Sequence, residues 1–172
     1  MAILEIFKYP ASVLREKAAV VNQSDLSVRK LVADMLETMY GAPGVGLAAP
    51  QVGVLQRIVV IDVATEDKGK DPLILINPEI IHSDGEMITG EEGCLSIPEV
   101  WGDVSRFQRV RLKFFDLAGI EHELTAENLL ARVIQHEVDH LDGVLFIDRM
   151  SKIKRDLLKM KLRKKAKLAA RE

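Results

Sequence analysis

An internal disulfide is excluded by the near absence of cysteine. The 172 residues include a single cysteine, Cys94, which has no second thiol with which to pair. Nothing in the cysteine content therefore favours an oxidising compartment. A chain of this length buries about two-thirds of its unfolded surface, so a hydrophobic core can hold it without disulfides.

Long apolar runs are absent as well. No segment approaches the roughly 18 apolar residues that a membrane-spanning helix requires. The first residues, MAILEIFKYP, include Glu5 and lack both a basic leader and a long apolar stretch, so we expect no signal peptide and no membrane partner. These absences make the cytoplasm the expected location. Hydrophobic residues still make up 48% of the chain, which together with its length predicts one ordinary globular domain.

The whole chain has no large excess of either charge sign, and its formal net charge is −2. This balance excludes a uniformly basic nucleic-acid-binding protein, and we expect no DNA partner. The charge is unevenly distributed along the chain. Residues 151–172 contain 10 basic and 2 acidic residues, whereas residues 1–150 contain 14 basic and 24 acidic residues. We therefore expect an acidic body followed by a basic C-terminal segment.

The spacing of apolar residues predicts three helices, over residues 25–40, 127–141 and 151–169. Ser24 or Asp25 can cap the first helix, and Thr125 can cap the second. Asp142 and Gly143 predict the end of the second helix. The third helix is amphipathic, with one apolar stripe among its basic residues.

Strand-forming runs lie between the first two helices, at residues 57–63, 73–78, 79–81, 109–116 and 120–124. Pro78 marks a break or an edge, and the last two runs predict a hairpin. The glycine- and proline-rich segment 41–53 predicts a shaped loop that is neither regular helix nor central strand. This order predicts an α+β fold, with small antiparallel or mixed sheets around a central helix.

The sharpest chemical signal is the pentad 136–140, His-Glu-Val-Asp-His, within the second predicted helix. His136 and His140 lie one turn apart, within about 40° on the helix, so both imidazoles can bind one metal ion. Glu137 lies close enough to act on water at that metal. Two surface histidines are the alternative, but the apolar neighbours favour a metal site; His82 and His122 have no such pattern, and we assign them to the surface.

A catalytic metal site of this kind needs a third protein ligand and an open position. No histidine follows His140, and the nearby carboxylates are Asp142 and Asp148. Upstream lies Cys94, preceded by Gly93, and a thiolate suits iron or zinc. A lone cysteine is more often a small buried hydrophobic residue, so the residues alone leave the third ligand open.

Three motifs occur together in a fixed order: GVGLAAPQ at 44–51, EGCLS at 92–96 and QHEVDH at 135–140. This set resembles the peptide deformylase family in its compact bacterial form. These enzymes remove the formyl group from the initiator methionine of nascent polypeptides, which are therefore the implied substrates. The resemblance covers residues 1–150, which we expect to form the catalytic domain. Residues 151–172 would be a basic helix that belongs to the same domain or forms a docking arm.

The resemblance also implies individual roles. It implies metal ligation by Cys94, His136 and His140, general acid/base catalysis by Glu137, oxyanion stabilisation by Gln51 and the Leu95 N–H, and substrate-amide binding by the backbone of Gly46. The implied metal is one ferrous ion, Fe2+, which zinc, nickel or cobalt (Zn2+, Ni2+ or Co2+) can replace. The donor set by itself favours zinc.

Recognition of methionine requires an apolar slot beside the metal, for which the candidates are Val45, Leu129, Val133 and the aliphatic part of Arg132. Packing in the helix core is the alternative for the last three residues. Trp101 either lines the cleft or closes the core, and the sequence does not decide between these positions.

Ligand histidines usually donate their second N–H group to an acceptor. Glu92 and Asp139 are candidates for orienting the site in this way, with Arg106 or Arg109 as their partner. Solvated surface charge is the alternative interpretation for these carboxylates.

The basic segment 151–172 has two interpretations. It is either an amphipathic helix whose apolar stripe packs on the body, or an arm that binds ribosomal RNA, since clustered cations release counterions from phosphates. No aromatic residues interrupt the lysines, which argues against stacking on single-stranded bases. The rival functions for the whole chain are a zinc peptidase or other amidase, and a non-catalytic ribosome-binding protein with a structural metal.

Overall fold

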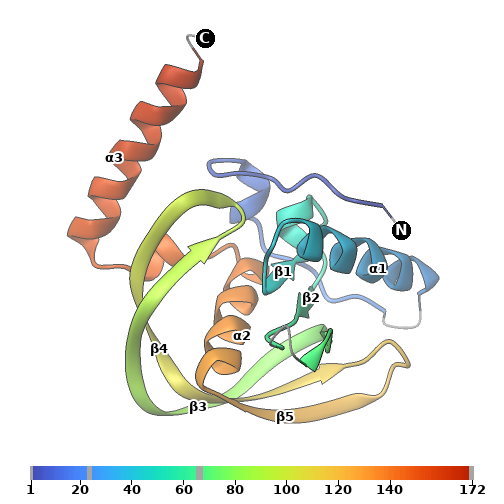
Figure 1. Cartoon of the computed structure of the whole chain (residues 1–172). Helices are drawn as coiled ribbons and strands as arrows, with labels where there is room; N and C mark the ends of the chain where they lie inside the picture. Colours follow the sequence, from blue (N-terminus) through green and yellow to red (C-terminus); the bar gives the residue numbers. More distant parts are fainter. Residues whose placement is uncertain (1, 23–24, 65–67, 171–172) are drawn as a thin grey trace.

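The computed structural model describes residues 2–22, 25–64 and 68–170 (Figure 1). Three helices and five strands are found in these ranges: α1 (Leu26–Gly41), β1 (Gly46–Ala48), β2 (Ile58–Ile61), β3 (Leu73–Cys94), β4 (Ile97–Phe115), β5 (Glu121–Glu127), α2 (Asn128–Leu141) and α3 (Lys152–Ala169). Short 3-10 turns occur at Ser12–Arg15, Ala49–Val52 and Phe146–Arg149. The predicted α+β fold is confirmed.

The five strands form one sheet in the order β1-β2-β3-β4-β5, and each neighbouring pair is antiparallel. Strands β3 and β4 form a long hairpin that curves around α2 (Figure 1). The register between them shifts at several points, and such bulges bend and twist a strand pair. The sheet therefore wraps around a central helix, as expected from the sequence.

The predicted strands at 73–78 and 79–81 are parts of the single strand β3, which is 22 residues long. Residues 82–94 of this strand were not predicted from the sequence. Their composition is polar and includes glycine, and pairing with β4 supports them rather than local propensity. The predicted break near Pro78 is confirmed by a register shift between Ile76 and Glu79. Asn77 adopts a left-handed conformation there, with φ of 51°.

The predicted loop at 41–53 contains a short strand that the sequence analysis did not anticipate. Residues Gly46–Ala48 form β1, which lies at one edge of the sheet and pairs with β2. The 3-10 turn Ala49–Val52 follows directly. An edge strand requires pairing on one side alone, which explains how a glycine-rich segment can join the sheet.

The helix boundaries confirm most of the sequence signals. Asp25 caps α1, since its Oδ1 accepts a hydrogen bond from the Ser27 N–H at 2.9 Å, while Ser24 lies outside the described residues. Thr125 was the wrong cap for α2, because it pairs within β5 and the N-cap position is Glu127. The strand continues further than expected before the helix begins. Gly143, with φ of 72°, confirms the end of α2.

Helix α2 lies at the centre of the molecule, and ten of its 14 residues are buried. Its apolar residues pack against the sheet in one core cluster, while α1 packs on another cluster formed with β1 and β2. Five of the buried α2 residues are polar: Gln135, His136, Glu137, Asp139 and His140. Buried polar groups require partners, so this end of α2 marks a candidate site.

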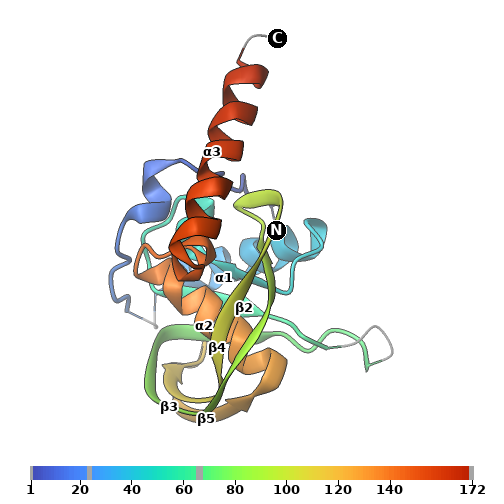
Figure 2. The same cartoon turned by 90° about the vertical axis from the view of Figure 1, so that its left-hand side faces the viewer.

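Helix α3 extends away from the body, as Figures 1 and 2 both show. None of its described residues is buried. Leu158 and Leu162 pack partly against a third core cluster, which includes Leu14 and Ile97. None of the helices in the described ranges is both long enough and apolar enough to cross a membrane.

Candidate active site

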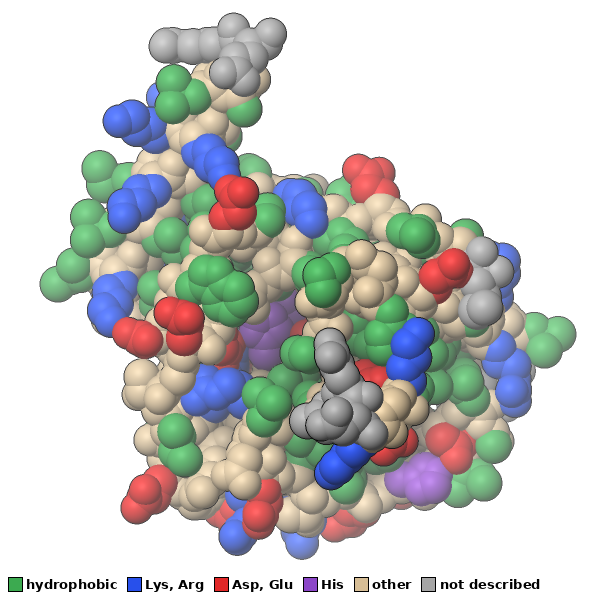
Figure 3. Space-filling view, in the orientation of Figure 1, with side chains coloured by type: hydrophobic (Ala, Val, Ile, Leu, Met, Phe, Trp, Pro, Cys, Tyr) green, Lys and Arg blue, Asp and Glu red, His purple; other side chains and the backbone are tan. Residues whose placement is uncertain are grey.

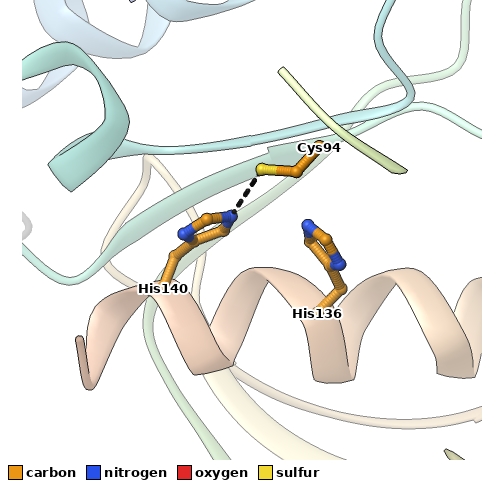
Figure 4. Close-up of side chains that lie close together, drawn as sticks. All are labelled: Cys94, His136 and His140. Carbon is orange, nitrogen blue, oxygen red and sulfur yellow. Dashed lines mark hydrogen bonds between the residues drawn. The ribbon is translucent and has the colours of Figure 1, made fainter. Parts of the chain in front are cut away.

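The site begins with three donor side chains from two elements. His136 and His140 come from α2, and Cys94 is the last residue of β3. One ligand atom from each lies within 4.8 Å of the other two. Sγ of Cys94 is 3.3 Å from Nε2 of His140, and the side chains point toward one another (Figure 4). The structure thus brings Cys94, the upstream candidate for the third ligand, close to the two histidines.

The donor set suits a divalent transition metal. Nδ1 of His136 is 2.9 Å from Oε2 of Glu92, so Nε2 is the nitrogen that can bind a metal. Burial and the neighbouring His136 lower the pKa of His140, which favours the neutral, metal-binding imidazole. Burial also opposes protonation of His136, but hydrogen bonds with Cys94 and Glu92 outweigh it and raise its pKa to about 10. A metal bound here would displace that proton, since ligands must be deprotonated.

Glu92 belongs to a buried network of charged residues. Arg106 binds it in a bidentate manner, with Nε 2.9 Å from Oε1 and Nη2 3.0 Å from Oε2. Arg106 also donates to Asp139 at 2.6 Å, and Arg149 binds the same carboxylate. Arg132 donates to Oε1 of Glu92 at 2.8 Å. Neither Arg149 nor the place of Arg132 in this network was predicted from the sequence.

The alternatives for the arginine partner are thereby resolved in favour of Arg106. Arg109 lies on the exposed side of β4, where it pairs with Glu127 at 2.7 Å. Burial opposes ionisation of Glu92, but its hydrogen bonds with His136 and Arg106 outweigh burial and lower its pKa to about 2. Glu92 is therefore an anion that can hold the Nδ1–H group of His136.

Glu137 is buried beside the three donors. A Cβ atom at position 46 would lie 2.5 Å from Oε1 of Glu137, so the missing side chain of Gly46 makes room for the carboxyl group. Oε2 is buried and has no hydrogen-bond partner within the described ranges. Burial raises the pKa of Glu137 to about 7. A carboxyl group with this pKa can both accept and donate a proton near neutral pH.

The side-chain amide of Gln51 is held in one orientation. Its Oε1 accepts a hydrogen bond from the Ala48 N–H at 2.9 Å, so its NH₂ group points the other way. Nε2 lies 3.5 Å from Sγ of Cys94 and 3.1 Å from Oγ of Ser96. Leu95 lies between Cys94 and Ser96 in the sequence, and it lines a cavity together with Gln51 and Cys94. Ser96 is a contact that the sequence analysis did not single out.

A cavity of about 600 Å³ lies beside these groups, and its lining includes Gly46, Gln51, Cys94, His136 and Glu137. Figure 3 shows histidine at the bottom of a hollow on this face of the molecule. All four candidates for the methionine slot line the cavity: Val45, Leu129, Arg132 and Val133. Trp101 also lines it and is 65% exposed, so it borders the cleft and does not close the core.

The remaining two histidines lie on the surface, as predicted. His82 is 3.7 Å from Asp84, and its side chain is 58% exposed. His122 is 2.7 Å from Asp116 in the turn between β4 and β5. Neither belongs to the group of donors at the cavity.

Comparison with known proteins agrees with the motifs. The profile of the polypeptide deformylase family matches residues 3–156. The peptide deformylase of Thermodesulfovibrio yellowstonii is 49% identical over 165 residues, which cover 96% of this chain and 99% of the relative. The peptide deformylase of Alkalilimnicola ehrlichii is 54% identical over 164 residues, which cover 95% of this chain and 91% of the relative.

Solved structures give the same result. A peptide deformylase from Synechococcus elongatus, crystallised in complex with actinonin, matches with a TM-score of 0.88 and 45% identity, over 95% of this chain and 88% of that one. A peptide deformylase from Legionella pneumophila matches with a TM-score of 0.88 and 44% identity, over 99% of both chains. The chain therefore belongs to the peptide deformylase family, whose members are hydrolases that remove the N-formyl group from the initiator methionine of nascent polypeptides.

Proposed function

We propose that Cys94, His136 and His140 hold one metal ion, and that Glu137 performs the proton transfers of deformylation. The observation that carries this assignment is the approach of three donor atoms within 4.8 Å, beside the buried carboxyl group of Glu137. Two of the donor residues, Cys94 and His136, line the cavity. When bound there, a metal supplies a Lewis acid that makes water more acidic and polarises a carbonyl oxygen.

Glu137 has two tasks in this reaction. It accepts a proton from the water molecule that attacks the formyl carbon, and it returns a proton to the amine as the carbon–nitrogen bond breaks. The products are formate and a peptide with a free N-terminus. The pKa of about 7 that burial gives this carboxyl group suits both transfers.

Negative charge that develops on the formyl oxygen requires donors that are already in place. We assign this role to the Gln51 amide and to the backbone N–H of Leu95. The hydrogen bond from Ala48 to Oε1 of Gln51 supports the assignment, because it fixes which end of the amide faces the site. A donor held in advance loses little free energy to reorganisation during the reaction.

The substrate backbone is proposed to bind along β1. This strand pairs with β2 on one side, and Gly46 lines the cavity on the other side. An exposed strand edge can bind an extended peptide through main-chain hydrogen bonds. The methionine side chain would then occupy the slot between Val45, Leu129 and Val133, with the carbon chain of Arg132 as a further wall.

We further propose ferrous iron as the working metal, since the family typically uses it, with zinc, nickel or cobalt as substitutes. The thiolate and two imidazoles are compatible with each of these metals. Because nascent polypeptides are the family's substrates, we expect the enzyme to work in the cytoplasm.

The assignment is tested by anaerobic purification, metal analysis and a formate-release assay. We expect one metal ion per chain and release of formate from formyl-Met-Ala-Ser. In Cys94→Ala we expect metal affinity to fall at least about 100-fold, since loss of residues that merely orient ligands already costs 10–100-fold. Full metal content and full activity in Cys94→Ala would contradict the proposed ligand set. Cleavage of internal peptide bonds without formate release would instead indicate a peptidase.

We also propose that α3 is a docking arm for the ribosome. Its basic residues lie on a helix that projects from the body, and none of its described residues is buried (Figure 1). Such a helix can attract phosphate groups while the catalytic body, which carries the acidic excess, remains free. Arg171, the last basic residue, lies outside the described ranges.

A variant with four glutamine substitutions tests this arm without removing Leu158 and Leu162, which pack on the core. The substitutions are placed at Lys161, Arg163, Lys164 and Lys167. If all four residues contact phosphates, the plot of log affinity against log salt should become shallower, and the magnitude of its negative slope should decrease by about 3. Ribosome cosedimentation at several salt concentrations measures this slope.

The control variant carries four glutamines at basic residues of the body: Lys17, Lys30, Arg111 and Lys113. We expect its salt dependence to match that of the unmodified protein. Ribosome binding that does not weaken as salt rises, or that survives deletion of residues 151–172, would contradict the proposed role of α3 as a docking arm.

A further inference from the structure

Arg132 lies on the same face of α2 as His136, one turn earlier in the helix. It lines the cavity next to Leu129 and Val133, and only 16% of its side chain is exposed. A long arginine side chain can place its methylene groups on an apolar surface while its charged end binds elsewhere. Arg132 can therefore form a wall of the slot with its carbon chain.

The guanidinium group of Arg132 is anchored on two strands. Nη1 donates to Oε1 of Glu92 at 2.8 Å and to the carbonyl of Val104 at 2.9 Å. Nη2 donates to the carbonyl of Ile88 at 2.6 Å. Gly90 makes room for this arrangement, because a Cβ atom there would lie 3.1 Å from Cζ of Arg132. Contacts with both β3 and β4 leave the side chain little freedom to move.

Glu92 connects Arg132 to the donor cluster. Its Oε1 accepts from Arg132, whereas its Oε2 is 2.9 Å from Nδ1 of His136. Arg106 spans both oxygens. Because Arg132 binds the oxygen that His136 does not use, it helps Arg106 to fix the orientation in which the other oxygen meets His136. One side chain thus touches both the cavity and the residue that orients a proposed metal ligand.

We propose that Arg132 is a positioning residue that controls two properties together. Its anchored carbon chain makes the slot selective for the unbranched methionine side chain, because a fixed wall does not move aside for a branched one. Its guanidinium group holds Glu92, and through it His136, in the orientation that retains the metal. This inference rests on the proposed ligands Cys94, His136 and His140.

Arg132→Met tests both properties, because methionine retains the unbranched, apolar character of the chain but has no N–H groups. We expect cobalt affinity to fall about 10-fold, the lower end of the effect of residues that orient metal ligands. This affinity is measured by competition with a chelator, followed through the visible absorption of cobalt. We also expect the ratio of kcat/KM for formyl-methionyl over formyl-leucyl peptides to fall about 10-fold, a typical effect of one methylene in an apolar pocket.

Three further variants separate the two properties. Val133→Ala should change the ratio of kcat/KM for formyl-methionyl over formyl-leucyl peptides, because Val133 lines the slot. It should leave cobalt affinity unchanged, because Val133 has no side-chain donor for Glu92. Arg132→Lys keeps the carbon chain but lacks the planar fork, so it should lose more cobalt affinity than selectivity. Arg109→Met, on the exposed side of β4, should change neither measurement.

A change in one measurement alone, or in neither, would overturn the proposal for a folded Arg132→Met protein. If circular dichroism shows that Arg132→Met does not fold, Arg132→Lys becomes the deciding variant. Wild-type cobalt affinity and wild-type substrate selectivity in Arg132→Lys would then overturn the proposal. Failure of the proposed metal site has a separate signature. Cys94→Ala would then still bind cobalt with unchanged affinity, whatever the Arg132 variants show.

Discussion

Replacing Glu137 with alanine or glutamine is expected to abolish nearly all formate release while the metal content stays unchanged. General acid–base catalysis contributes about 10²–10⁴-fold, and both proton transfers are assigned to this one carboxyl group. Glutamine keeps the shape of the side chain but cannot accept a proton from water. The effect should therefore appear in kcat, measured by formate release, with one metal ion per chain by elemental analysis.

The control for this experiment is Glu127→Gln at the N-cap position of α2. Glu127 is exposed and pairs with Arg109, so its loss should leave kcat unchanged. Normal turnover by Glu137→Ala with intact metal would defeat the proposed mechanism. Loss of both metal and turnover would instead assign Glu137 a role in holding the site together.

The two histidines beside Glu137 were predictable because their relation is local. A separation of four residues in a helix places side chains on one face, whatever the rest of the chain does. Cys94 carries no such local signal, since it lies 42 positions before His136 and the spacing reflects the path of the β3–β4 hairpin. Its selection as a ligand came from the resemblance of three motifs, and the structure brings the three donor atoms together.

The charged network around Glu92 was only partly predictable for the same reason. Strand periodicity could have indicated that Arg106 is buried. Val104 and Arg106 are two residues apart in β4, so they share a face of the strand, and both are buried. An arginine in a buried strand position requires an anionic partner. The identity of that partner depends on how β3, β4 and α2 meet, which local propensities do not contain.

The second large effect is expected at Arg106, whose replacement by methionine should lower the free energy of unfolding by about 3 kcal/mol. The side chain is 5% exposed and binds two buried carboxylates, Glu92 and Asp139. Breaking a buried ion pair by removing one partner costs about 3–5 kcal/mol, because the remaining charge is left uncompensated. Arg132 and Arg149 still bind these carboxylates, so we expect the lower end of the range.

Urea unfolding of the metal-free protein measures this effect without a contribution from metal binding. Lys154→Met is the matched control, because Lys154 forms an ion pair with Asp103 in which both side chains are more than half exposed. Exposed pairs contribute about 0–1 kcal/mol, so the control should unfold almost like the wild type. An Arg106→Met protein within about 1 kcal/mol of the wild type would show that the network does not stabilise the fold in this way.

A double variant distinguishes uncompensated charge from lost packing. Methionine replaces most of the apolar volume of arginine, so the expected loss in Arg106→Met comes chiefly from the carboxylates that remain. Adding Glu92→Gln removes one of these negative charges while keeping the shape of the side chain. Stability should then recover in part, since a neutral amide costs less to bury than an unpaired carboxylate. If the two substitutions instead destabilise additively, Arg106 acts mainly through packing between the sheet and α2.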